Sequence, residues 1–78
     1  MSNSVAESVA KLVREAISES GRTKMSLSDK TGIPYPTLNR KLAGKTEFSF
    51  SELLELAEAL GVSPAAFTPP QFRSVRAA

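Results

Sequence analysis

The 78-residue sequence predicts an all-α fold, a compact bundle of about five helices. Apolar residues recur at three- and four-residue intervals in the longest segments, which is the spacing of one helix face. Four glycines follow such segments, where a residue with a positive φ angle commonly ends a helix: Gly21, Gly32, Gly44 and Gly61. No segment shows the alternation of apolar and polar residues that a half-buried strand requires.

The first helix is expected to begin at Ser4, which would form a capping box with Glu7, and to end at Gly21. Both side chains of a capping box satisfy backbone amides that the first helical turn leaves without partners. The apolar face of this helix would comprise Val5, Val9, Leu12, Val13, Ala16 and Ile17.

A second, short helix would run from about Lys24 to Thr31, with Thr23 as its N-cap and Gly32 at its end. Its apolar contacts would be Met25 and Leu27. The residues from Ile33 to Pro36 cannot continue this helix, because each proline lacks an amide donor and restricts the residue before it.

Pro36 can open a third helix at its first position, and this helix would continue to Ala43 and stop at Gly44. Leu38 and Leu42, four residues apart, would form its buried side. The core of the domain is expected to contain Leu27, Ile33, Leu38, Leu42, Leu53, Leu54, Leu60 and Phe67.

Ser49 and Glu52 form a second capping box pattern, which predicts a fourth helix that ends at Gly61. Its broad apolar face would comprise Phe50, Leu53, Leu54, Leu56, Ala57 and Leu60. Ser63 and Pro64 then predict a last turn or short helix that carries Ala65, Ala66 and Phe67 into the core.

These elements predict one domain over residues 1–67, followed by a tail over residues 68–78 that is extended or contacts a second subunit. Two consecutive prolines and the lack of a helical start signal favour the extended form. The alternatives are disorder, a basic arm, or a first part that folds back through Phe72. The Met1 start and the tail slightly favour a complete small protein over a fragment of a longer one.

The composition argues against an enzyme. The sequence has no cysteine and no histidine, which removes disulfides, Cys/His zinc sites, thiol nucleophiles and imidazole acid–base chemistry. We therefore expect no catalytic residue, no metal, no cofactor and no small-molecule ligand. The apolar runs are far short of a membrane span and the N-terminus does not resemble a signal peptide, so the expected location is cytoplasmic.

Charge is divided unevenly along the chain, although the net charge is only +2. Residues 22–45 contain six basic side chains and one acidic one, Asp29, whereas residues 46–72 contain four glutamates and no basic residue. A local excess of positive charge attracts phosphate, while an acidic face discourages it from binding there. A solvated surface that happens to separate the charges is the simpler alternative.

Two short helices separated by a glycine turn, at about residues 23–43, have the layout of a helix-turn-helix. In this motif the second helix enters the DNA major groove. Apolar residues lie where the two helices would meet, and Ser28 supplies a small residue where they would cross closely.

Residues 4–67 resemble the Cro/repressor family of helix-turn-helix domains found in phage repressors and small bacterial regulators, a lambda-repressor-like fold. The segment from Thr37 to Lys45 is similar to the family's recognition helix and the Gly-Lys that follows it. The run from Leu53 to Pro64 resembles its fourth helix and the connection to the fifth, and is the more specific signal.

The resemblance implies a sequence-specific regulator of transcription that binds a pseudo-palindromic operator in double-stranded DNA as a homodimer. It assigns base reading to Tyr35, Pro36, Thr37, Asn39 and Arg40. It assigns phosphate contacts to Arg22, Thr23, Lys24, Lys41, Lys45 and Thr46. Side-chain chemistry agrees for several of these, since arginine pairs with guanine, asparagine with adenine or a phosphate, and a methyl or ring with thymine.

The chain also departs from the family pattern. Pro34 and Pro36 stand where serine, threonine or glutamine is common, and Thr31 replaces an aliphatic residue. For Tyr35 the alternative is packing on the turn, and for Lys41 it is plain solvation. The alternative function is an antitoxin-like protein-interaction module, which would use the acidic face of the fourth helix and the Phe72 tail.

Overall fold

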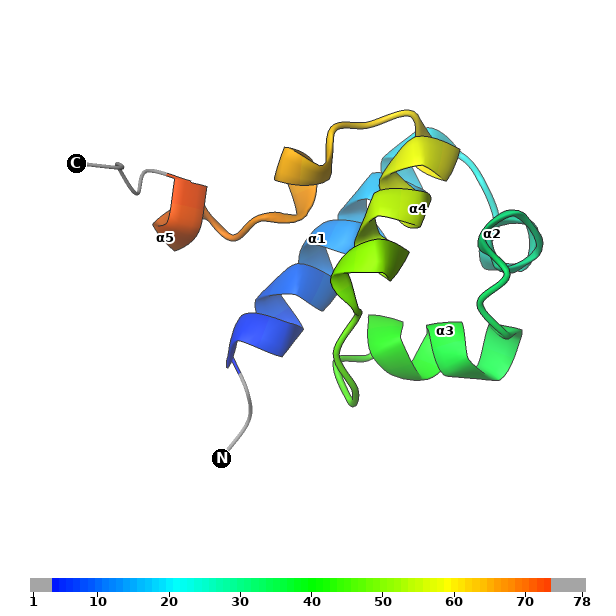
Figure 1. Ribbon diagram of the computed structural model, residues 1–78, viewed down its shortest axis with the longest axis horizontal. Helices are drawn as coiled ribbons and strands as arrows, with labels where there is room; N and C mark the ends of the chain where they lie inside the picture. Colours follow the sequence, from blue (N-terminus) through cyan, green and yellow to red (C-terminus); the bar gives the residue numbers. More distant parts are fainter. Residues whose placement is uncertain (1–3, 74–78) are drawn as a thin grey trace.

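The computed structural model describes residues 4–73, which fold into an all-helical bundle with no strand in that range (Figure 1). This confirms the fold class that the sequence predicts. The elements in chain order are α1 (Ser4–Ser20), α2 (Lys24–Thr31), α3 (Tyr35–Leu42), α4 (Phe50–Leu60), the 3-10 helix η1 (Pro64–Phe67) and α5 (Pro70–Arg73). The side chain of Ser4, and with it the expected Ser4–Glu7 capping box, lies outside the described residues.

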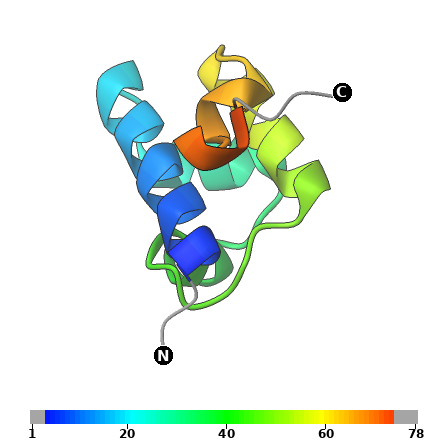
Figure 2. The same ribbon diagram turned by 90° about the vertical axis from the view of Figure 1, so that its left-hand side faces the viewer.

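One apolar core joins the first five of these elements. Its buried side chains are Ala10, Val13 and Ile17 of α1, Leu27 of α2, Ile33 of the turn, Leu38 and Leu42 of α3, Leu56, Ala57 and Leu60 of α4, and Phe67 of η1. Because each of these five elements contributes at least one buried residue or directly adjoins one, removing any of them would expose the apolar side chains of the others. In Figures 1 and 2, α3 lies along the lower edge of the bundle, and α1 and α4 extend above it.

Several apolar residues that the periodicity assigns to the core are on the surface instead. Leu54 is 41% exposed, Phe50 is 72% exposed and Met25 is 57% exposed. Ala65 and Ala66 are exposed as well, so η1 carries only Phe67 into the core. The expected core was therefore wrong at these positions, because periodicity identifies an apolar face, whereas the part of that face that becomes buried depends on what packs against it.

The local signals at both ends of α2 and of α4 agree with the structure. Thr23 Oγ1 accepts a hydrogen bond from the Ser26 amide at 3.0 Å, which makes Thr23 the N-cap of α2. The Ser49–Glu52 capping box is present at the start of α4, and Gly61 ends this helix with φ 72°. These ends are fixed by contacts within four residues, which explains why the sequence alone predicts them.

The chain after Phe67 differs from the expected extended tail. Pro69 is buried, and Pro70–Arg73 form one helical turn. Arg73 Nε donates a hydrogen bond to the Thr68 carbonyl at 2.7 Å, which stabilises this turn. Phe72 is 48% exposed, and α5 lies at the other end of the molecule from α2 (Figure 1). The remainder of the expected tail, residues 74–78, lies outside the described residues.

Candidate nucleic-acid interface

The turn between α2 and α3 is held by hydrogen bonds from small polar side chains. Gly32 has φ 79° and donates its amide to the Ser28 carbonyl at 2.9 Å. Ser28 Oγ donates to the Ile33 carbonyl at 2.6 Å, and Thr31 Oγ1 donates to the Leu27 carbonyl at 2.7 Å. The threonine that departs from the family pattern thus bonds the α2 backbone, and the turn fixes the direction in which α3 leaves.

One side of α3 packs into the core and the other faces solvent. Leu38 and Leu42 are almost completely buried. Pro36, Arg40 and Ala43 are exposed and share the opposite side, since residues four and three apart lie on one helix face. The periodicity of the sequence predicts this division correctly.

The remaining base-reading candidates lie on or beside the exposed side of α3. Thr37 and Asn39 are half-buried and flank it, while Tyr35 is 37% exposed at the start of the helix. The structure thus brings the five residues assigned to base reading onto one helix, with Arg40 at the centre of the solvent face.

The start of α3 differs slightly from the expected one. The first helical residue is Tyr35, so Pro36 occupies the second position, and Pro34 is an N-cap with no side-chain hydrogen bond. Leu38 donates to the Pro34 carbonyl at 2.8 Å, whereas Pro36 has no amide to donate. The first turn therefore presents the amides of Tyr35 and Thr37 without a capping side chain.

The start of α2 places three of the phosphate candidates together on the surface. Arg22, Thr23 and Lys24 are all exposed. Thr23 uses its oxygen as the acceptor of the cap, which leaves its hydroxyl hydrogen able to donate to an anion. The positive end of the α2 dipole adds to the two side-chain charges. This corner of the molecule therefore suits an anion such as a phosphate group.

The loop after α3 presents Lys45 and Thr46. Gly44, with φ 79°, donates to the Lys41 carbonyl at 3.0 Å, and Lys45 donates its amide to the Arg40 carbonyl at 3.1 Å. This pair of bonds is a Schellman motif, which closes the helix and turns the chain sharply. Lys45 and Thr46 follow directly and are exposed. Gly44 therefore sets the direction in which their side chains leave the helix.

Lys41 differs from the other cationic phosphate candidates because its ammonium is paired with a carboxylate of the protein. Its Nζ lies 2.5 Å from Glu52 Oε1, and only 15% of its side chain is exposed. The same Glu52 oxygen accepts the Ser49 amide of the α4 capping box at 2.8 Å. Lys41 thus joins the end of α3 to the start of α4, and its charge is balanced by a carboxylate.

The pKa of Glu52 reflects this arrangement. Burial raises the pKa of this carboxyl, but hydrogen bonds from Lys41 and the Ser49 amide, together with the charge of Lys41, outweigh burial and lower the pKa below its ordinary value. A carboxyl whose pKa is lowered by folding stabilises the protein above its unfolded pKa, and this stability disappears as the pH falls through the folded value.

Glu52→Gln should therefore destabilise the domain near neutral pH and lose its effect in acid. Glutamine still accepts the Ser49 amide, so the change isolates the charge opposite Lys41. We expect a loss of about 0.2–1 kcal/mol at pH 7 that vanishes below about pH 4, measured by urea unfolding at both values. Glu58→Gln, an exposed carboxylate on the same helix, is the control. If the change in the free energy of unfolding depended on pH in the same way for both variants, this interpretation would be contradicted.

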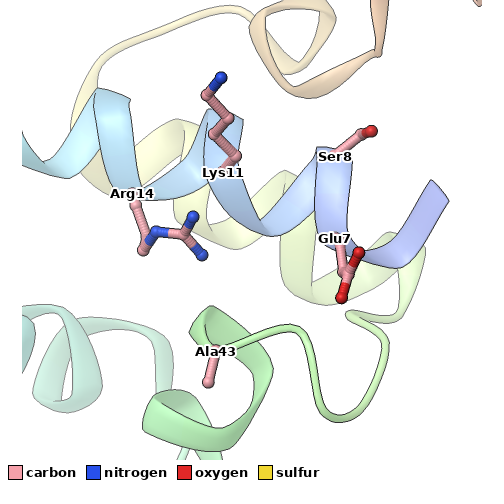
Figure 3. Close-up of a pocket in the computed structure, with 5 residues that line it drawn as sticks. All are labelled: Glu7, Ser8, Lys11, Arg14 and Ala43. Carbon is pink, nitrogen blue, oxygen red and sulfur yellow. The ribbon is translucent and has the colours of Figure 1, made fainter. Parts of the chain in front are cut away.

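A contact that the sequence does not reveal joins α1 to α3. Arg14 Nη1 donates to the Leu42 carbonyl at 2.5 Å, across 28 residues of chain. Figure 3 shows the Arg14 side chain directed from α1 toward the end of α3 that carries Ala43. The sequence marks Arg14 only as a polar residue off the apolar face, and no local signal identifies its partner.

Among residues 4–73, the acidic side chains form no group of three or more that would hold a metal ion. Helices with both the length and the apolar character for crossing a membrane are likewise absent from this range.

The model of one protein family, the Cro/C1-type helix-turn-helix DNA-binding domain, matches residues 13–66 of the chain. The match includes the C-terminal half of α1 from residue 13, together with α2, the glycine turn, α3 and α4. No curated protein and no solved structure shows significant similarity to the chain.

Proposed function

Because the chain belongs to the Cro/C1-type helix-turn-helix family and is thus a DNA-binding regulator, we propose that it is a sequence-specific repressor of the Cro or phage and bacterial repressor type. The observation that carries the proposal is the solvent face of α3, which presents Arg40 on a helix held firmly by Leu38 and Leu42. It would act where the DNA is, in the cytoplasm of a bacterium or of a phage-infected host, by blocking or contacting polymerase.

In the proposed complex, α3 lies in the major groove of double-stranded DNA. Arg40 makes the bidentate contact to a guanine, and Thr37, Tyr35 and Pro36 supply apolar contacts, for which a thymine methyl is the natural partner. Asn39 sits beside Lys24 in a shallow depression rather than on the outermost face of α3. This position supports the phosphate alternative for Asn39 over adenine.

The proposed backbone contacts flank α3 on two sides. Arg22, Thr23 and Lys24 bind phosphate at the start of α2, and Lys45 and Thr46 bind it after α3. Lys41 is the weakest member of this group, since its ammonium is already bonded to Glu52. We propose that Lys41 orients α3 against α4 and contributes little to phosphate binding.

We further propose that two copies bind a pseudo-palindromic operator, with their α3 helices in successive major grooves about one helical turn apart. Phe50 and Leu54 lie one turn apart on α4 and are 72% and 41% exposed, which supports a protein–protein contact on this helix. Sedimentation with saturating duplex tests it: two chains per operator are expected, and one chain per operator would contradict the dimer.

Exposed residues of α4 and α5 favour one alternative, an antitoxin-like module that binds a second protein. Glu55 and Glu58 are exposed on α4, and Phe72 is 48% exposed. This function would use the α4 and α5 surfaces rather than α3, so substitutions on α3 would leave partner binding intact.

The deciding experiment is selection of bound duplexes from a random library at about 150 mM salt, which screens much of the non-specific attraction. Two enriched inverted half-sites are the expected result. A single half-site would retain DNA reading and remove the dimer. No enrichment, with binding that vanishes as salt rises, would contradict sequence-specific regulation and favour the protein-partner alternative.

A further inference from the structure

A depression between α1, α2 and α3 gathers positive charge beside the recognition helix. It is lined by Arg14 of α1, Lys24 of α2, Asn39 and Leu42 of α3, and Ala43. Two of these side chains are cations, Asn39 adds an amide donor, and no carboxylate lines it. Such a surface attracts an anion.

Arg14 reaches this depression from outside the helix-turn-helix. One of its five N–H donors is bonded to the Leu42 carbonyl, the position at the end of α3 where a cation also complements the helix dipole. Among the hydrogen bonds of residues 4–73, this is the one that Arg14 makes, so its other donors remain for a ligand. Because the Leu42 bond already holds the guanidinium, less conformational freedom is lost when it binds an anion.

We propose that Arg14 is a DNA contact, a helix-one arginine that clamps one backbone phosphate together with Lys24 and Asn39. The proposal depends on the DNA-binding function and extends its surface to α1. Arginine suits the position because its planar guanidinium can donate to the Leu42 carbonyl and to a phosphate oxygen at the same time. By holding a phosphate of the DNA backbone against α1, this contact would fix how deeply α3 enters the major groove.

The chain offers a matched control on the same helix. Lys11 is also an exposed cation of α1, but it does not line the depression that contains Lys24 and Asn39. Figure 3 shows Lys11 directed to the side of α1 away from α3, while Arg14 points toward it. Removing either charge changes the net charge equally, so only local geometry separates the two variants.

The test compares duplex binding by Arg14→Gln, Arg14→Lys and Lys11→Gln with the wild type between about 50 and 200 mM salt. Loss of one phosphate contact should reduce the salt slope by about one, so the affinity ratio of wild type to R14Q should fall about 3.5-fold across this range. The loss of affinity caused by R14Q should be equal for selected and scrambled duplexes, because a phosphate contact carries no sequence information. R14K should keep the slope, and K11Q should match the wild type.

R14Q with the wild-type slope would overturn the proposal, even if its melting temperature falls, because a tether to α3 alone would not release counterions. Equal slopes for R14Q and K11Q would do the same. If R14Q is too unstable to titrate, the Arg14 Nε–H resonance of the wild type, assigned by its absence in R14K, must shift on adding duplex. An unmoved resonance would also overturn it.

Failure of this inference is distinguishable from failure of the proposed function. If the wild type binds duplex and Lys24→Gln reduces the salt slope while R14Q does not, only the role of Arg14 is refuted. If the wild type binds no duplex, the DNA-binding function and the clamp are both refuted.

Discussion

Replacing Leu38 by alanine is expected to lower the free energy of unfolding by about 2–5 kcal/mol. Leu38 is completely buried and faces the core from α3. Its loss removes apolar burial and leaves a cavity that the surrounding helices fill only in part. A domain of this size has a total stability of only about 5–10 kcal/mol, so the variant would lose a large fraction of its stability and melt at a lower temperature.

Urea unfolding and melting curves measure this effect, and Met25→Ala is the control. Met25 is 57% exposed on α2, and alanine favours a helix, so we expect a change within about 0.5 kcal/mol. DNA affinity of Leu38→Ala should fall together with its folded fraction. Similar stabilities for the two variants would mean that α3 is not held by the core as described.

Arg40→Ala should flatten discrimination at one or two base pairs of the operator by about 1–3 kcal/mol, roughly five- to 150-fold in relative affinity. Arg40 is exposed on the face of α3 opposite Leu38, so its removal should leave the stability of the domain nearly unchanged. The measurement is affinity for the selected operator and for all single-base variants of one half-site.

Lys45→Ala is the matched comparison, because it removes one exposed positive charge just beyond the same helix. A phosphate contact carries no sequence information, so this variant should weaken all duplexes alike and reduce the salt slope by about one. If the two variants behaved identically on every sequence, the division into base-reading and phosphate-binding residues would be wrong.

The sequence by itself determines both ends of α2 and of α4, the turn that follows α3, and the two-sided character of α3. Thr23, Gly32, Gly44 and the Ser49–Glu52 box act on backbone groups within five residues, so their effect is readable without any tertiary contact. The four-residue spacing of Leu38 and Leu42 likewise fixes which side of α3 is buried and leaves Arg40 on the other. The all-α fold class follows from these features, whereas the family is indicated by the resemblance of the motif residues and shown by the match of the family model to residues 13–66.

Only the tertiary structure decides which apolar and charged residues are used, and with which partners. Phe50 and Leu54 fit an apolar pattern, yet no neighbouring helix covers them among the described residues. Lys41 meets Glu52 11 residues away and Arg14 meets Leu42 28 residues away, contacts that exist only because the core brings α1, α3 and α4 together. Sequence spacing specifies a face of a helix, whereas burial and pairing depend on what the rest of the chain places against that face.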